Sequence, residues 1–133
     1  MTSFLVTLSA AFCLLTAGAS GQSVRFAVIG DFGVDDANEL AVANLVKNNL
    51  RPEFIVTVGD NHYNGATAID RDIGKYFHDY IGNYRGTYGA GASSNRIFPA
   101  IGNHDYSTPG GYSNHLSYFP LNPSNRFFRL KKP

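Results

Sequence analysis

Three short apolar runs of this chain end in a glycine followed at once by a polar side chain, and this repeated pattern constrains the fold most. Residues 24–29 lead into Gly30-Asp31, residues 54–58 into Gly59-Asp60, and residues 97–101 into Gly102-Asn103-His104-Asp105. Short apolar runs closed by turn residues predict β-strands with buried side chains. The polar residues would then follow the carboxyl ends of three strands.

A helix is predicted between the first two strands. Asp35 or Asp36 can cap it, and Arg51-Pro52 ends it. Asp31 and Asp60 are separated by 29 positions, which fits one βαβ unit with parallel strands. The predicted apolar face of this helix consists of Ala37, Ala41, Val42, Leu45, Val46 and Leu50.

The middle of the chain predicts a second helix, a long loop and a weaker strand. The helix is expected within residues 68–80, and the Gly-, Ser-, Tyr- and Asn-rich stretch 82–95 is expected to be a loop. Pro99 weakens the third strand. Residues 109–125 look turn-rich, and residues 127–130 predict one more strand. The apolar positions of the second helix are Ile69, Ile73, Tyr76, Phe77 and Tyr80.

Length, charge and the first residues limit the class of protein. A chain of 133 residues with 44% hydrophobic residues suits one globular domain, and its net charge of +1 favours no nucleic-acid partner. Residues 1–19 are uncharged and end in Ala17-Gly18-Ala19, which is typical of a signal peptide and predicts a secreted or lumenal protein. A buried first strand is the alternative. No segment is long enough for a membrane span, and Cys13, the only cysteine, lies in the leader.

The three turns predict a cation site. The carboxyl ends of parallel strands meet at one edge of a sheet, which is where ligands bind in α/β proteins. Two carboxylates there, Asp31 and Asp60, would repel each other unless a cation lay between them. Oxygen ligands with a nitrogen donor nearby suit Mg, Mn, Fe or Zn. A carboxylate that bridges two such ions is typical of centres that activate water for phosphoryl transfer.

These turns carry a family resemblance. Asp31-Phe32-Gly33, Gly59-Asp60-Asn61-His62-Tyr63 and Gly102-Asn103-His104-Asp105 resemble the first three of five metal-site motifs of the calcineurin-like metallophosphoesterases, D-x-G, G-D-x-x-Y and G-N-H-[DE]. The tyrosine is similar to that of the purple acid phosphatases, especially the small tartrate-resistant type. The resemblance spans residues 25–130. It implies an α/β fold, the N-terminal part of a metallophosphoesterase sandwich built of βαβ units with mainly parallel strands.

The resemblance also implies roles for five residues. Asp31 and Tyr63 would bind Fe(III), and Asp60 would bridge to a divalent Fe, Zn or Mn ion that Asn103 also binds. His104 would be the catalytic residue, as proton donor or phosphate ligand, with Asp105 as a candidate to orient it. The implied reaction is hydrolysis of a small phosphate monoester, as in an acid phosphatase.

The family's two later motifs, V-x-x-H and G-H-x-H, do not occur in this sequence. His115 follows His104 too closely to replace their three histidines. We therefore expect residues 20–133 to be an incomplete domain with four of seven metal-binding side chains, and the 133-residue chain alone to be inactive. Two alternatives are a phosphodiesterase or nucleotidase of the same superfamily and a non-catalytic secreted module.

Single residues also have simpler interpretations. Asn103 could form an Asx turn, and Tyr63 could be an aromatic lid over the turns. His62 occupies a position that the family leaves unspecified, so we do not expect it to bind metal. His78 lies in the second predicted helix and is expected to be solvated or packed.

Overall fold

Three parallel strands form the centre of the molecule in the computed structural model, which describes residues 23–119. They are β1 (Phe26–Ile29), β2 (Phe54–Thr57) and β3 (Ile97–Phe98), in the order β1-β2-β3. Phe26 pairs with Phe54, and Ile55 pairs with Ile97. The predicted parallel α/β sheet is therefore confirmed. The predicted leader 1–19 and the predicted strand 127–130 lie outside the described residues.

The first helix begins and ends where the sequence predicts. α1 (Ala37–Asn44) continues as η1 (Leu45–Leu50), which has wider π-helical turns. The Asp36 carboxylate accepts hydrogen bonds from the amides of Asn38 and Glu39, both at 2.9 Å, so Asp36 is the cap. The helix stops at Arg51, which has a left-handed backbone with φ of 46°.

The face that this helix buries differs from the predicted one. Glu39 and Ala43 are buried, whereas five of the six predicted apolar residues are exposed and only Val46 among them is buried. The difference arises because Glu39 is needed inside the fold, where its carboxylate accepts backbone hydrogen bonds from the preceding loop. A buried helix face that contains a glutamate cannot be recognised from the spacing of apolar residues alone. The five exposed residues are Ala37, Ala41, Val42, Leu45 and Leu50.

The second predicted helix is confirmed as one helical stretch whose turn width changes along its length. It contains η2 (Ala66–Ala68), η3 (Asp70–Gly74), α2 (Lys75–Phe77) and η4 (His78–Tyr80). All five of the apolar residues predicted to face the core are buried, and they are Ile69, Ile73, Tyr76, Phe77 and Tyr80. Residues 82–95 form a loop, as predicted.

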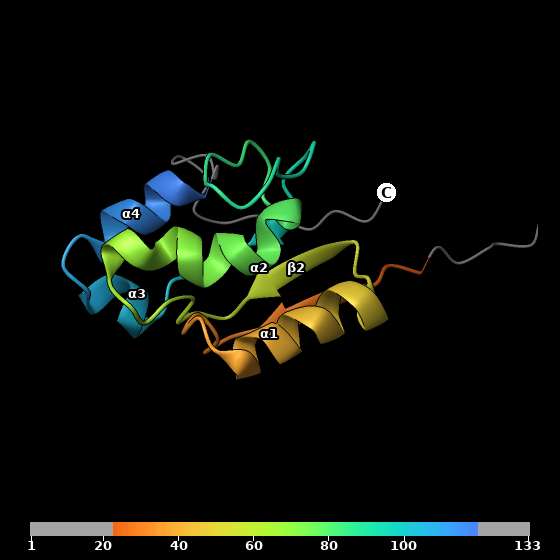
Figure 1. The fold of residues 1–133 in the computed structure, drawn as a ribbon, viewed down its shortest axis with the longest axis horizontal. Helices are drawn as coiled ribbons and strands as arrows, with labels where there is room; N and C mark the ends of the chain where they lie inside the picture. Colours follow the sequence, from red (N-terminus) through yellow and green to blue (C-terminus); the bar gives the residue numbers. More distant parts are fainter. Residues whose placement is uncertain (1–22, 120–133) are drawn as a thin grey trace, which may run out of the picture.

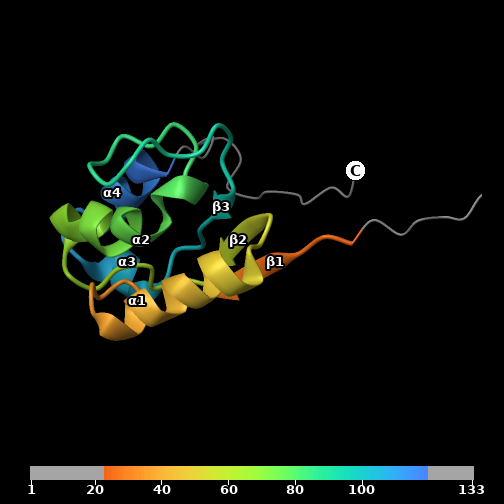
Figure 2. The same ribbon diagram turned by 45° about the vertical axis from the view of Figure 1, so that its right-hand side comes forward.

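The helices lie on one face of the sheet, so the described part of the chain has two layers (Figures 1 and 2). Ala27, Ile55 and Ile97 point into the single core cluster, together with residues of α1, η1 and the second helical stretch. The opposite face carries Phe26 and Val28, which are 52% and 56% exposed. β1 was predicted to be a buried strand, and the structure shows that only one of its faces is covered by residues 23–119.

The segment after β3 contains two helices where the sequence predicted turns. Residues 102–105 were expected to form only a turn, but they enter the short helix α3 (Asn103–Ser107). The turn-rich stretch likewise contains α4 (Gly111–Tyr118). α4 follows Gly110, whose φ is 75°, and it is held by the burial of His115 and of Phe119 just after it. Packing therefore outweighs the weak helix propensity of its Gly, Ser, Asn and Tyr residues.

Candidate metal centre

Asp31 and Asp60 occupy matching positions just beyond the carboxyl ends of β1 and β2. Both have a left-handed backbone, with φ of 52° and 51°. The Asp31 amide donates to the Gly59 carbonyl, and the Phe32 amide donates to the Asp60 carbonyl, both at 3.3 Å. The two turns therefore lie side by side. Left-handed non-glycine residues cost about 1 kcal/mol or more and tend to occur at functional sites.

Tyr63 reaches from the second turn to the first. Its hydroxyl donates a hydrogen bond of 2.8 Å to the Asp31 carboxylate, and its amide donates to the Gly33 carbonyl at 2.9 Å. Burial, this hydrogen bond and the negative charges of Asp31 and Asp60 raise the pKa of Tyr63 to about 12. The phenol therefore keeps its proton at neutral pH unless a strong Lewis acid replaces it.

The third turn meets the second at Asp60. The His104 amide donates a hydrogen bond of 2.8 Å to the Asp60 carboxylate. Gly102 approaches so closely that a Cβ atom there would lie 2.7 Å from the Asp60 Cγ atom. Asn103 lies between these two contacts, at the start of α3, and it is exposed. The His104 ring lies beside the Tyr63 ring, with 4.4 Å between ring centres and a tilt of 42° between the planes. Four of the five predicted residues are therefore joined in a chain of contacts, and Asn103 adjoins them.

The predicted link from Asp105 to His104 is not what the structure shows. Asp105 is fully buried, and its carboxylate accepts hydrogen bonds from the amides of Asn61, His62 and Gly102 and from the Asn61 side chain. Both oxygens are used in this way, since a buried carboxylate is stable only when its charge is compensated by donors. Asp105 therefore orients backbone, and the His104 ring is exposed on the other side of the turn.

The other histidines lie away from the rim that Asp31, Asp60, Tyr63 and His104 form. His62 is fully buried, with its Nε2 atom 3.8 Å from an Asp105 oxygen. His115 is buried in α4, where burial lowers its pKa to about 4. His78 packs in its helix, with Nδ1 2.9 Å from the Gly74 carbonyl oxygen.

The donor set at the rim fits a hard cation. Two carboxylates, a phenol and an amide supply oxygen atoms, which suit Mg, Mn and Fe(III) better than thiolate-preferring metals. Between residues 23 and 119, no three His, Cys, Asp or Glu side chains lie close enough to hold a metal ion. The rim has the carboxylates of Asp31 and Asp60 beside Tyr63 and Asn103, so the donors present could supply part of a metal site.

Sequence reasoning missed Glu39, a buried carboxyl behind the first turn. Its Oε2 atom accepts hydrogen bonds from the amides of Val34 and Asp35, at 3.1 and 2.7 Å. Its Oε1 atom is buried and has no hydrogen-bond partner among residues 23–119. Burial and the nearby charges of Asp72 and Asp35 raise the pKa of Glu39 to about 8. The sequence signal was an acidic residue in the first turn of a helix, where glutamate usually faces water.

Glu39 should make the free energy of unfolding depend on pH. The unfolded side chain titrates near 4.5 and the folded one near 8, so between these values the unfolded chain loses a proton that the folded chain keeps. The contribution of Glu39 to the free energy of unfolding is therefore greatest below pH 4.5. It falls by a few kcal/mol as pH rises to about 8. Urea unfolding of the wild type and Glu39→Gln between pH 4.5 and 9 measures this. The variant should lack this part of the slope.

The control for Glu39 is Glu53→Gln. Glu53 is exposed, and its carboxylate accepts a hydrogen bond of 3.1 Å from the Arg25 amide. Its substitution should leave the pH dependence of unfolding unchanged. If Glu39→Gln follows the wild-type curve throughout, Glu39 is not the titrating group.

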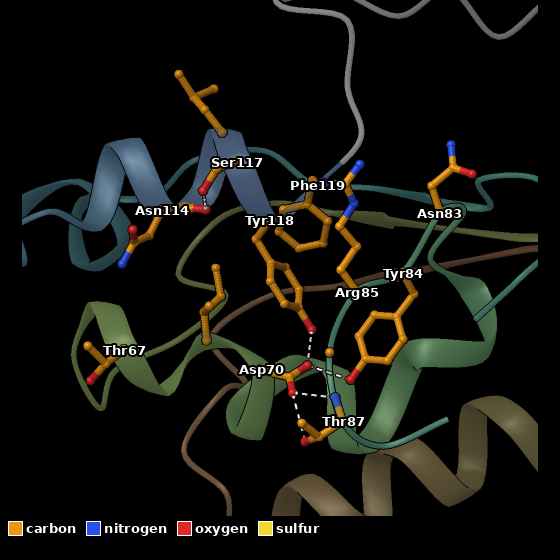
Figure 3. Close-up of a pocket in the computed structure, with 13 residues that line it drawn as sticks. Thr67, Asp70, Asn83, Tyr84, Arg85, Thr87, Asn114, Ser117, Tyr118 and Phe119 are labelled. Carbon is orange, nitrogen blue, oxygen red and sulfur yellow. Dashed lines mark hydrogen bonds between the residues drawn. The ribbon is translucent and has the colours of Figure 1, made fainter. Parts of the chain in front are cut away.

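A cleft of about 1010 Å³ lies between the second helical stretch and α4, and no candidate site residue lines it (Figure 3). Asp70 lies at its floor. The Asp70 carboxylate accepts hydrogen bonds from the hydroxyls of Tyr84 and Tyr118 and from the amide and hydroxyl of Thr87. Burial would raise the pKa of Asp70, but these hydrogen bonds lower it below its usual value. Both carboxylate oxygens of Asp70 therefore hold the loop 82–95 and α4 to η3.

A parallel α/β sheet with acidic and amide side chains gathered at its carboxyl edge is the arrangement in which α/β proteins place their ligand sites. The comparison with family models agrees, since the model of the calcineurin-like phosphoesterases matches residues 24–131. The chain belongs to this family, whose members are metal-dependent phosphoester hydrolases. The searches of curated proteins and of solved structures returned no match. No helix within residues 23–119 is long and apolar enough to cross a membrane.

Proposed function

We propose that this chain carries half of the metal centre of a purple acid phosphatase-type phosphomonoesterase. The observation that carries the proposal is the hydrogen bond between the Tyr63 hydroxyl and the Asp31 carboxylate at the edge where Asp60 also lies. A phenol beside a carboxylate at this edge suits Fe(III), which binds phenolate strongly. Asp31, Tyr63 and Asp60 would hold Fe(III), and Asp60 and Asn103 would hold the divalent ion.

When bound, the metal pair would supply a hydroxide nucleophile and neutralise charge on the phosphoryl oxygens. The residues of the chain orient the ligands and provide a proton donor. Asp60 is kept in place by the His104 amide, so its carboxylate is oriented before any ion arrives. The His104 ring lies on the exposed side, where it can donate a proton to a leaving oxygen or bind a phosphoryl oxygen.

The substrate proposed is a small phosphate monoester, and the proposed location is secreted or lumenal. The exposed His104 and Asn103 leave the rim open to a small molecule in solution. The location rests on the uncharged residues 1–19 and their Ala17-Gly18-Ala19 end.

The test is Fe(III) binding followed by visible absorption. One equivalent of Fe(III) added to the 133-residue chain should give a phenolate-to-iron charge-transfer band, because the Tyr63 phenol would release its proton to solvent and bind as phenolate. Tyr63→Phe should lack the band, whereas Tyr88→Phe, which changes an exposed tyrosine in the long loop, should keep it. A band of equal strength in Tyr63→Phe would refute the ferric assignment.

Hydrolysis is tested separately with p-nitrophenyl phosphate and bis-p-nitrophenyl phosphate. We expect no robust turnover of either substrate by the 133-residue chain, because the sequence contains only the first three of the family's motifs. Robust monoester turnover would contradict the interpretation of residues 20–133 as an incomplete domain. A preference for the diester would favour the phosphodiesterase alternative. Absence of any metal binding would favour a non-catalytic module.

A further inference from the structure

Asp105 is the point where the second and third turns of the rim are joined. Its Oδ1 atom accepts from the amides of Asn61 and His62, at 2.9 and 3.2 Å. Its Oδ2 atom accepts from the Gly102 amide at 2.9 Å and from the Asn61 side chain at 2.8 Å. One carboxylate thus receives donors from the loop after β2 and from the start of α3.

The side chain of Asn61 extends this junction toward the sheet. Its Nδ2 atom also donates to the Ala100 carbonyl at 2.7 Å, and its Oδ1 atom accepts from the Thr57 hydroxyl. Thr57, Asn61 and Asp105 are all buried. Buried polar groups that are fully satisfied fix a local structure more firmly than apolar packing does. The junction is therefore rigid and is connected to the ends of β2 and β3.

We propose that Asp105 is the positioning residue that holds Asp60 and Asn103 in one metal site. Asp60 directly precedes the two residues whose amides Asp105 binds, and Asn103 directly follows Gly102. The distance between the two proposed ligands is therefore set by hydrogen bonds to one buried carboxylate. This inference rests on the proposed function, because it assigns Asp105 a role in the metal affinity of that site.

The hydrogen bond from the His104 amide to Asp60 reports on this role. Neither partner touches the Asp105 carboxylate in the described contacts, yet the bond spans the two turns that Asp105 joins. If Asp105 only stabilised its own surroundings, the His104 amide would stay protected when Asp105 is changed. If Asp105 sets the spacing between the turns, that protection is lost.

The experiment compares Asp105→Asn with Asp70→Asn in the full chain. Each carboxylate accepts four hydrogen bonds, but Asp70 binds residues of the cleft in Figure 3 and none of the rim. Calorimetric titration with Mn²⁺ should show affinity about 10- to 100-fold weaker for Asp105→Asn, which is the usual effect of removing a residue that supports a ligand. The Asp70→Asn variant should bind within about threefold of the wild type.

Amide hydrogen exchange provides the second measurement. The His104 amide should exchange at least about tenfold faster in Asp105→Asn and at the wild-type rate in Asp70→Asn. Unchanged exchange at His104 would overturn the inference, as would unchanged Mn²⁺ affinity. If the wild type binds no Mn²⁺ but His104 responds as expected, the proposed function fails and the spacing role of Asp105 stands.

A milder variant covers the case in which Asp105→Asn does not fold. Asn61→Ala removes one of the four donors to Asp105 and leaves the three backbone amides. It should weaken Mn²⁺ binding and His104 protection in the same direction by a smaller factor. An Asn61→Ala variant that unfolds at the wild-type urea concentration and shows neither effect would also contradict the inference.

Discussion

Asp60→Asn is expected to weaken divalent metal binding by more than about 100-fold while the chain remains folded. The asparagine keeps an oxygen that can accept the hydrogen bond from the His104 amide. It also tolerates the left-handed backbone that Asp60 adopts, with φ of 51°. What it removes is the negative charge beside Asp31. Metal-free Asp60→Asn should therefore be as stable as the wild type, because one charge of a repelling pair is lost.

Mn²⁺ titration and urea unfolding of the metal-free protein measure the two parts of this prediction. The matched control is Asp79→Asn, which changes a half-exposed carboxylate that pairs with Lys47 at 3.0 Å, away from the rim. Asp79→Asn should bind Mn²⁺ as the wild type does. Equal Mn²⁺ affinities for the two variants would remove Asp60 from the proposed site.

Gly33→Ala should be the most destabilising single substitution near the rim. A Cβ atom at Gly33 would lie 2.7 Å from both the Asn61 carbonyl carbon and the His62 Cα atom, and closer still to the Asn61 carbonyl oxygen. These are backbone atoms of a turn that is held by Asp105, so they cannot move aside. We expect a loss of about 3 kcal/mol or more in the free energy of unfolding.

Gly65→Ala separates crowding from backbone strain in this comparison. Gly65 has a φ of 90°, but no atom lies within 4 Å of the position its Cβ would take. Its ψ is 159°, which places it in a region that is essentially restricted to glycine, so the alanine there should cost about 2 kcal/mol, from backbone strain alone. Urea unfolding of both variants gives the two values, and similar losses would mean that the turns are not as closely packed as described.

The strands could be predicted because each apolar run is closed by turn residues, and the second helix because its burial follows a simple period. Ile69, Ile73 and Tyr76 recur at three- or four-residue spacing, and all are buried. The parallel order followed from the distance between Asp31 and Asp60, which leaves room for one crossover helix. The meeting of the three turns followed from the same topology, since carboxyl ends of parallel strands share an edge.

The parts that could not be predicted depend on buried polar groups. Glu39 lies on the buried face of α1 because the amides of Val34 and Asp35 need an acceptor, and apolar spacing does not register that need. Asp105 was expected to orient His104 but instead binds backbone of both turns. α4 depends on where His115 packs, which is a tertiary contact. In each case a contact that apolar spacing does not register decides which residues are buried.

The left-handed backbone at Asp31 and Asp60 limits which side chains can occupy the rim. Among non-glycine residues, asparagine and aspartate enter this conformation most easily, because a short polar side chain can bond to the nearby backbone. Glutamate has the same charge but gains no such local hydrogen bond, and β-branched residues are excluded on steric grounds. Aspartate is therefore the one anionic residue that both turns accept at low cost. The backbone thus selects the residue type at these two positions independently of any ion.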